Sequence, residues 1–349
     1  MRVKFIFTSL LILCITISCS LYEGESNFKE VQAIEYEDNL VSDEHSFENI
    51  TTFLNPGDIV NVSDEYIIIS DADPSGFIKV FSIPDLEFLY AWGEQGRGPH
   101  EFQFIPLNEI NTNGNHLILY EIGTRVLREY KVNDTTLVPV NETSLQYNGQ
   151  TNPLTGITKV KEDFYIADEG VNVDSSNHRF IALKPGQDEP HFSFGNYPDT
   201  ELTGYEKKFE FLNTTNSSED GERVAAFYFY HNRFEIYDHQ GNLLRDIRIN
   251  DESINFTNRE PLDFFQYRSI KTASDDFLYL MAMHENQDKI DENIETFRTS
   301  FEKWDWDGNP VNRAMFDVPI HNFVVSEKHK KIYAYSVLDL HTIFEFDIP

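Results

Sequence analysis

Short segments in which apolar and polar residues alternate are the dominant pattern of this chain. Residues 234–249 show it most clearly, because an aromatic segment, the turn Asp-His-Gln-Gly-Asn and a second apolar segment follow one another. Residues 301–310 repeat the first half of this unit, and residues 78–92 form a degenerate copy. A period of two places successive side chains on opposite faces of a β-strand, and glycine supplies the backbone freedom that a hairpin turn needs. Spaced copies of such a hairpin predict a radial all-β array.

Turn residues divide the chain into six β-rich blocks of about 40 to 50 residues, the length of a four-stranded propeller blade. The last block has room for only three strands. Residues 30–37 form an additional alternating segment, and we expect this N-terminal strand to complete the last blade and remove an open sheet edge. The sequence therefore predicts an all-β, six-bladed β-propeller, whereas a pair of β-sandwiches would need a linker that no shift in composition marks. The blocks are residues 57–92, 104–145, 154–195, 207–249, 265–318 and 320–349, with a polar insertion at 285–296 that reads as a loop or short helix.

The N-terminus reads as a targeting segment. Arg2 and Lys4 precede an apolar run, residues 5–17, that is too short to span a bilayer comfortably. The run ends at a small residue followed by Cys19, as in a bacterial lipobox, although Thr16 stands where leucine is more usual. We predict a lipoprotein signal peptide (residues 1–18), lipidation of Cys19, a tether (19–29) and the propeller (30–349). The alternative is an ordinary secretory signal with an incidental cysteine.

The charge of the chain limits the macromolecules it can bind, and its cysteine content limits the covalent and metal sites it can contain. The chain carries 28 basic and 59 acidic residues, a net charge of −31, so nucleic acid is not an expected partner. The second cysteine, Cys14, lies in the predicted signal peptide, and the mature chain therefore has no cysteine to pair with Cys19. No disulfide or zinc–thiolate site is expected in the domain. We predict an outer-membrane lipoprotein, periplasmic or surface-exposed, held at the membrane by its N-terminal lipid.

One motif is specific enough to suggest a family. Residues 92–102, Trp-Gly-Glu-Gln-Gly-Arg-Gly-Pro-His-Glu-Phe, resemble the G-x-x-G-x-G-P-G-E-F signature that links adjacent blades in propellers of the NHL type. The segment is also similar to TolB-like six-bladed propeller lipoproteins of Bacteroidota, with His100 in place of the usual glycine. The expected role is a blade linker, in which the glycines allow the turn, the proline stiffens it, the glutamate accepts backbone N–H bonds and the phenylalanine is an apolar plug. These residues are Gly93, Gly96, Gly98, Pro99, Glu101 and Phe102.

The resemblance implies a scaffold rather than a reaction. Many such lipoproteins have no assigned activity, related propellers are binding platforms, and some unrelated six-bladed propellers are calcium-dependent lactonases or hydrolases. The chain contains neither G-x-S-x-G nor H-E-x-x-H, and segments such as residues 71–76 and 305–308 lack the ligand spacing of a calcium loop. No catalytic residue, metal site or cofactor is predicted, and calcium remains an open alternative.

Recognition is expected at the funnel around the central channel, where loops of several blades meet. The predicted function is a binding module for a peptide, a glycan or another envelope protein. One alternative is a hydrolase, lactonase or lyase that uses a divalent cation in the channel, and another is a structural subunit of an envelope complex. The candidate channel contacts, which could instead line a water-filled tunnel, are Arg97, His100, Lys207, Asn213, Arg268 and His321.

Overall fold

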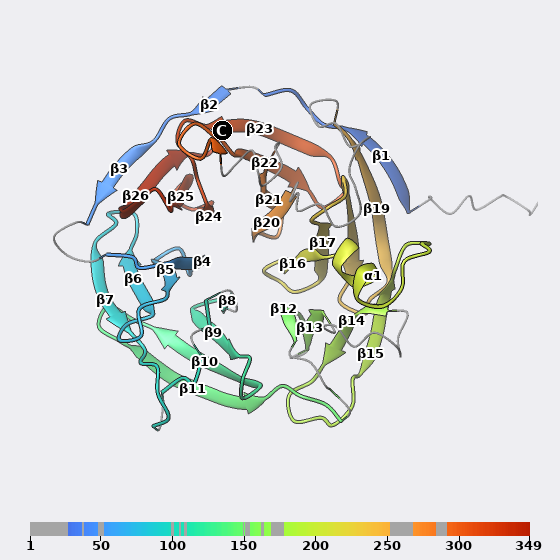
Figure 1. The fold of residues 1–349 in the computed structure, drawn as a ribbon, viewed down its shortest axis with the longest axis horizontal. Coiled ribbons are helices and arrows are strands. Elements are labelled where there is room, and N and C mark those ends of the chain that lie inside the picture. The colour runs from blue at the N-terminus through green and yellow to red at the C-terminus, as the bar shows by residue number, and fades with distance from the viewer. Residues whose placement is uncertain are drawn as a thin grey trace, which may run out of the picture.

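The computed structural model describes residues 27–36, 38–47, 52–98, 101–104, 106–107, 110–148, 150, 154–161, 164–168, 178–251, 268–283 and 292–349. Within these residues, strands form six sheets around a central axis, and one short helix, α1 (Gly204–Glu210), precedes the fourth sheet (Figure 1). This architecture confirms the predicted six-bladed β-propeller. No helix in the described part of the chain is both long and apolar enough to cross a bilayer. Residues 285–291 of the predicted polar insertion lie outside the described residues.

Each blade runs from an innermost strand at the axis to an outer strand at the rim. Blade one is β4 (Pro56–Val62), β5 (Tyr66–Asp71), β6 (Ile78–Ser82) and β7 (Phe88–Trp92), and blade two is β8 (Ile110–Asn113), β9 (His116–Glu121), β10 (Val126–Val132) and β11 (Leu137–Ser144). Blade three is β12 (Thr155–Lys159), β13 (Tyr165–Asp168), β14 (His178–Leu183) and β15 (Phe192–Asn196), and blade four is β16 (Asn213–Ser217), β17 (Arg223–Tyr228), β18 (Arg233–Asp238) and β19 (Leu243–Asn250). Blade five is β20 (Arg268–Ala273), β21 (Phe277–Ala282), β22 (Ser300–Asp305) and β23 (Pro310–Phe316), and blade six begins with β24 (Asn322–Ser326), β25 (Lys331–Ser336) and β26 (Asp339–Asp347).

The middle strands are apolar on both faces because each blade packs between two others. In β5, Ile67, Ile68 and Ile69 are all fully buried. Ile67 and Ile69 pack with residues of blade six such as Tyr335, whereas Ile68 packs with residues of blade two such as Leu119. The alternation seen in the sequence therefore sorts side chains between two neighbouring cores, and no single blade could bury its own apolar faces.

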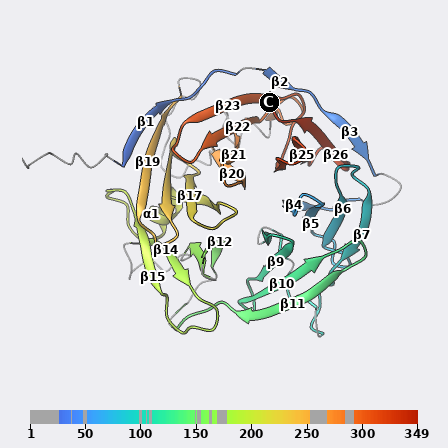
Figure 2. The same ribbon diagram turned by 180° about the vertical axis from the view of Figure 1, so that it is seen from behind.

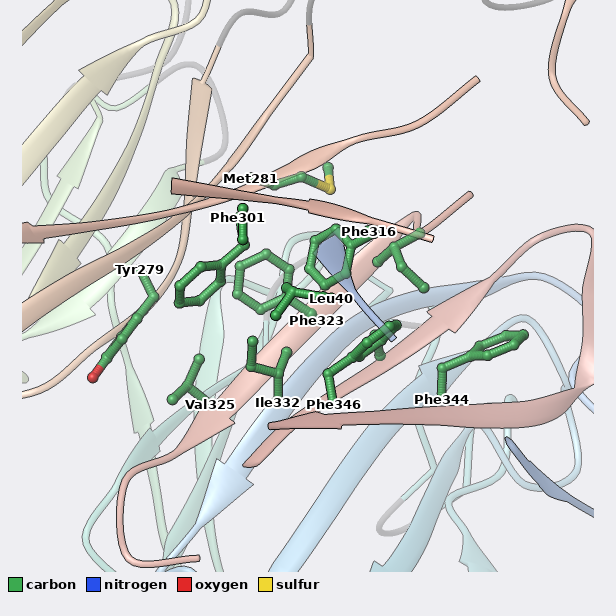
Figure 3. Packing of buried hydrophobic residues seen from close by; sticks show 13 residues of the cluster. Leu40, Tyr279, Met281, Phe301, Phe316, Phe323, Val325, Ile332, Phe344 and Phe346 are labelled. Carbon is green, nitrogen blue, oxygen red and sulfur yellow. The ribbon is translucent and has the colours of Figure 1, made fainter. Parts of the chain in front are cut away.

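Aromatic side chains fill the spaces between blades. Figure 3 shows the cluster between blades five and six, where rings of both blades interleave. Phe316 of β23 lies 5.6 Å from Phe323 of β24 and 5.0 Å from Phe346 of β26, measured between ring centroids. Rings at these tilted and edge-on arrangements contribute stabilisation beyond their buried area.

The repeated turns share one geometry. The Asp238 carboxylate accepts the backbone N–H of Asn242 at 2.9 Å, and Gly241 has a φ of +81°. Asp305 and Gly308 repeat this arrangement in blade five, where Gly308 has a φ of +75°. The aspartates therefore cap hairpin turns, and the glycines take a conformation that other residues rarely adopt.

The N-terminal segment forms a strap of three short strands along the rim of blades four, five and six, and the view from behind shows the same path (Figure 2). β1 (Phe28–Gln32) pairs in parallel with β19, and β2 (Asp38–Leu40) pairs in parallel with β23. β3 (Asp43–Ser46) pairs antiparallel with β26 and is the fourth strand of blade six.

An N-terminal strand thus closes the ring as predicted, but the prediction that residues 30–37 supply it is wrong. Residues 30–32 lie on blade four, and residues 43–46 close blade six. The sequence of β3 is Asp-Glu-His-Ser, which has no apolar position, because this edge strand is exposed and is held by its backbone ladder. A search for alternating apolar residues therefore selects the wrong segment of the strap.

Candidate functional site

The innermost strands β4, β8, β12, β16, β20 and β24 surround a channel along the propeller axis. The first residues of these strands line a cavity of about 620 Å³, which we call the N-side cavity, and Asp58, Asn213 and Asn322 are among its lining residues. The last residues line a second cavity of about 400 Å³, the C-side cavity, which includes Asp64 and Val325. Volumes of this size hold small molecules in other proteins.

The two cavities meet at a ring of side chains that lines both, which we call the waist. Blades one to five each contribute one residue to it. Two of the five are lysines, although the chain as a whole is strongly acidic. The waist consists of Val60, Asn111, Lys159, Asn216 and Lys271.

β-Bulges place two ionisable side chains in the channel. The ladder between β20 and β21 shifts register between Ile270 and Thr272, so that Lys271 occupies the bulge. The ladder between β4 and β5 shifts between Pro56 and Ile59, a stretch that contains Asp58. Bulges interrupt the alternation of a strand and re-aim side chains, and they are common beside functional sites.

The channel moves the pKa values of both groups toward neutrality. Removal from bulk water raises the pKa of Asp58 to about 6, against the opposing effects of Lys271 and of a hydrogen bond from Asn322. The same desolvation lowers the pKa of Lys271 to about 8, and the Asp58 charge only partly offsets it. Within the described residues, Lys271 makes no hydrogen bond or close ion pair. An acid and an amine with such converging values are typical of ligand-binding and catalytic sites.

A histidine, His321, lies close enough to Lys271 to be affected by its charge. His321 directly precedes β24, and its backbone N–H donates to the Tyr335 carbonyl at 2.9 Å. Partial desolvation of the ring and the nearby Lys271 charge lower the pKa of His321. The shift favours the neutral ring, which can both donate and accept a hydrogen bond.

Much of the remaining polar lining holds the blades together. Hydrogen bonds from the innermost strands join neighbouring blades all the way around the channel, and the contact between blades one and two ends on Leu107, which precedes β8. Asn111 and Thr214 are therefore largely used by the fold, and a polar side chain in the channel is not by itself evidence of a ligand. The contacts are Asp58 N–H to Leu107 O (2.9 Å), Asn111 Nδ2 to Ile157 O (2.9 Å), Thr215 Oγ1 to Gly156 O (2.8 Å), Ile270 N–H to Thr214 Oγ1 (3.0 Å), Val325 N–H to Thr272 Oγ1 (3.3 Å) and Asn61 Nδ2 to Val325 O (3.3 Å).

The C-side cavity is acidic. Asp64, Glu219 and Glu327 line it, and Glu327 accepts hydrogen bonds from Ser274 and Tyr279. Burial and the surrounding carboxylates raise the pKa of Glu219. No group of three or more His, Cys, Asp or Glu side chains among the described residues is arranged to hold a metal ion.

The structure places the predicted channel contacts at different sites. Asn213 lines the N-side cavity, and His321 lies beside Asn322, which also lines it. Lys207 lies on α1, with Nζ 4.5 Å from the centroid of the Tyr197 ring, and lines neither cavity. Arg97 is exposed in the blade linker, and His100 lies outside the described residues, as does the predicted lipidation site Cys19.

Arg268 is not a channel residue. Its side chain is 1% exposed and lies in a buried ionic network on the opposite side of β20 from the channel-lining Ser269. Arg268 Nη2 donates to Asp251 at 2.7 Å, and Arg313 donates to the same carboxylate at 2.9 Å. The prediction that Arg268 contacts a ligand in the channel is therefore wrong, and Arg268 has a structural role. Lys271, three residues later, occupies the channel instead.

The described residues of the motif after Trp92, 93–98 and 101–102, lie in a compact turn that follows β7. Gly93 has a φ of +92°, and the Glu101 carboxylate accepts the backbone N–H of Gly98 at 2.6 Å. Gly96 donates its backbone N–H to the Phe102 carbonyl at 2.9 Å. Phe102 is fully buried, with its ring centroid 5.0 Å from that of Phe77. Pro99 lies outside the described residues.

Sequence reasoning missed Asp58, Lys159 and Lys271. The signal that could have found Lys271 is its neighbourhood, Ser-Ile-Lys-Thr-Ala, in which one charge interrupts a small and apolar innermost strand. Even this signal does not place the side chain, because the bulge changes which face each residue occupies.

A six-bladed β-propeller with an ionisable channel waist is the class of protein that this fold and site define. Residues 40–328 match the family described as TolB-like 6-blade propeller-like. The chain therefore belongs to the TolB-like six-bladed propeller family, as the linker motif predicts.

Two solved structures from Bacteroides share the fold. A member of the duf4221 family from Bacteroides vulgatus superposes with a TM-score of 0.58 at 11% identity, covering 88% of this chain and 97% of that chain. A Bacteroides fragilis protein called a "Putative exported protein" gives 0.56 at 13% identity, covering 91% of this chain and 98% of that chain. At these identities the likeness shows the fold alone. No curated protein matches the chain.

Proposed function

We propose that this protein is an exported, lipid-anchored propeller that binds a small polar ligand in its central channel. The observation that carries the proposal is the pair Asp58 and Lys271, two ionisable groups presented by bulges of β4 and β20 and partly shielded from bulk water. The ligand is a free small molecule or the end of a peptide or glycan, including one carried by another envelope protein.

The other blades supply an internal comparison. Val60, Asn111 and Asn216 occupy the same waist without a charge, so the fold does not require an ionised side chain there. Removing a charge from water without close pairing costs stability. Such costs are characteristic of residues retained for binding or catalysis rather than for folding.

The N-terminal segment indicates how the propeller would be attached to a membrane. The described chain begins at the rim of blade four, where β1 lies along β19 (Figure 1). A lipid on Cys19 would therefore pull on the rim and not on the axis. The name of the Bacteroides fragilis neighbour also refers to export.

Ligand retention tests the channel. The purified protein is incubated with the low-molecular-weight fraction of an envelope extract from the bacterium that encodes it, and native mass spectrometry identifies compounds that stay bound. We expect wild type and the surface control Lys131→Met to retain a bound compound. Val60→Trp, whose larger side chain fills the waist, and Lys271→Met should both release it. Retention of no compound, or equal retention by all four proteins, would overturn the proposal.

Replacement of the predicted lipidation site tests the anchor. With Cys19→Ser, we expect the protein to move from the membrane fraction to the soluble fraction, because multiple acyl chains provide the durable attachment. Membrane retention unchanged by the substitution would show that this thiol does not carry the anchor.

A further inference from the structure

The polar side of the waist points to the chemical class of the ligand. We propose that the channel binds a small sugar acid, a polyhydroxylated molecule with one carboxylate, between Lys159, Asn216 and Lys271. This inference rests on the proposed ligand-binding function and assigns it a substrate class.

Lys159, Asn216 and Lys271 form a continuous arc, because β12, β16 and β20 are the innermost strands of three consecutive blades. The side-chain oxygen Oδ1 of Asn216 accepts the backbone N–H of Ser217 at 2.9 Å. Its amide nitrogen donates to no group in the described part of the chain. The Lys271 ammonium group beside this amide donor matches the acceptor oxygens of a carboxylate, and Lys159 adds a second positive charge to the arc.

A buried hydroxyl without a partner lies next to this arc. Ser269 is 1% exposed, its Oγ has no hydrogen-bond partner among the described residues, and it lines the N-side cavity two residues before Lys271. A buried polar atom that makes no hydrogen bond costs free energy unless a ligand or water satisfies it. Ser269 therefore adds a donor and acceptor for a ligand hydroxyl beside the proposed carboxylate position.

Across the channel from this arc the β4 position at the waist is apolar, whereas Asp58 of β4 and Asn322 of β24 line the N-side cavity away from the waist. Val60 faces the waist from β4, and Val324 of β24 lines the C-side cavity beside it. A sugar acid carries oxygens along one edge and C–H groups on its ring face, so it can satisfy both sides at once. The N-side volume of about 620 Å³ accommodates a molecule of that size.

The net charge of −31 does not oppose an anion at this site. Charges are screened over about 8 Å at physiological ionic strength, so most surface carboxylates act weakly at the axis. The groups that matter locally are Lys159, Lys271, Asp58, Asp168 and His321, together with the C-side acids Asp64, Glu219 and Glu327. Asp58 and Asp168 are the opposing charges that line the N-side cavity, and the raised pKa of Asp58 reduces its opposition below about pH 6.

Matched ligand pairs test the assignment by isothermal titration calorimetry at pH 6.5 and low salt. The acids are D-glucuronate, D-galacturonate and D-gluconate, and their uncharged partners are D-glucose, D-galactose and D-glucitol. We expect at least one acid to bind about tenfold or more tightly than its partner, since each charge-assisted hydrogen bond contributes that much. Lys271→Met should abolish the preference for the acid, Ser269→Ala should weaken both members of the pair, and the control Lys131→Met should change neither.

Absence of binding by all three acids, equal binding of an acid and its partner, or an unchanged preference in Lys271→Met would each overturn the sugar-acid assignment. This failure is distinct from failure of the proposed function. An uncharged compound that wild type retains and Val60→Trp releases would leave channel binding in place while removing the carboxylate.

Discussion

Arg268 and Glu302 are joined at two points inside blade five: Nε donates to Oε2 at 2.7 Å and Nη2 donates to Oε1 at 2.9 Å. Arg313 approaches the same Glu302 carboxylate at 3.1 Å, and Asp251 completes the network. All four side chains are nearly inaccessible to water, and their charges sum to zero. Burial alone would raise the pKa of Glu302, but the Arg268 charge and hydrogen bonds outweigh it and hold that pKa below its usual value.

Removal of one member of this network should be strongly destabilising. We expect Arg268→Met to lower the free energy of unfolding by about 3–5 kcal/mol, because it leaves an uncompensated buried carboxylate. The matched control is Arg245→Met, which breaks the exposed pair with Asp307 and should change stability by less than about 1 kcal/mol. Urea denaturation measures both, and similar values for the two variants would contradict a structural role for the network.

The blades were predictable from the sequence because the requirement on each middle strand is local. Ile67 and Ile68 must both be apolar, since their side chains enter the cores on opposite sides of the blade. The turns were predictable for a similar reason, because Asp238 and Gly241 adopt a geometry that few other residue pairs favour.

The channel could not be predicted in the same way. A side chain reaches the axis only if its strand is innermost and its register is right, and the bulge at Lys271 reverses the expected alternation. Arg268 was therefore predicted to line the channel, whereas the charged residue of β20 that lines it is Lys271. The strap was misassigned for another reason: β3 is recognised through its backbone by β26, and backbone pairing leaves no apolar pattern.

The blade linker predicts a contrast between two glycines. A Cβ added at Gly93 would lie 2.4 Å from the ring of Phe77, in a backbone conformation with φ of +92°. A Cβ at Gly114 would meet nothing within 4 Å, although φ is also positive, at +58°. We expect Gly93→Ala to cost about 2–4 kcal/mol from strain and overpacking together, and Gly114→Ala about 1 kcal/mol from strain alone. Thermal and urea unfolding of both variants provide the check, and equal losses would mean that Phe77 can move aside.

The strap predicts graded losses on truncation. A chain that starts at residue 42 keeps β3 but loses β1, β2 and Leu40, which is buried between blades five and six. Loss of the Leu40 contacts alone should cost about 1.5–3 kcal/mol. A chain that starts at residue 48 also loses β3 and exposes the edge of β26, so we expect a larger loss and self-association through that edge. Urea midpoints and size-exclusion chromatography compare the two, and equal behaviour would show that β3 does not close the ring.

Lys271 gives a prediction whose sign separates a binding role from a structural one. Because burial lowers the folded-state pKa of Lys271 to about 8 from 10.5, the folded state holds the proton less tightly than the unfolded state. The resulting penalty is fully present below pH 8, is relieved as pH rises from 8 to 10.5, and is absent above that range. We therefore expect Lys271→Met to stabilise the protein by about 1–3 kcal/mol at pH 7, reduced by whatever pairing with Asp58 is lost. Urea unfolding at pH 7 and pH 10 should show the gain shrinking at the higher pH, where wild-type Lys271 is mostly neutral.

Asp58→Asn is the companion variant. Since the pKa of Asp58 is raised to about 6 from 3.8, the cost of the charged Asp58 to folding stability is full above pH 6 and is lost as pH falls toward 3.8. Loss of stability at pH 7 in both variants would mean that the pair supports the fold, and the argument for a ligand at the waist would lose its energetic basis.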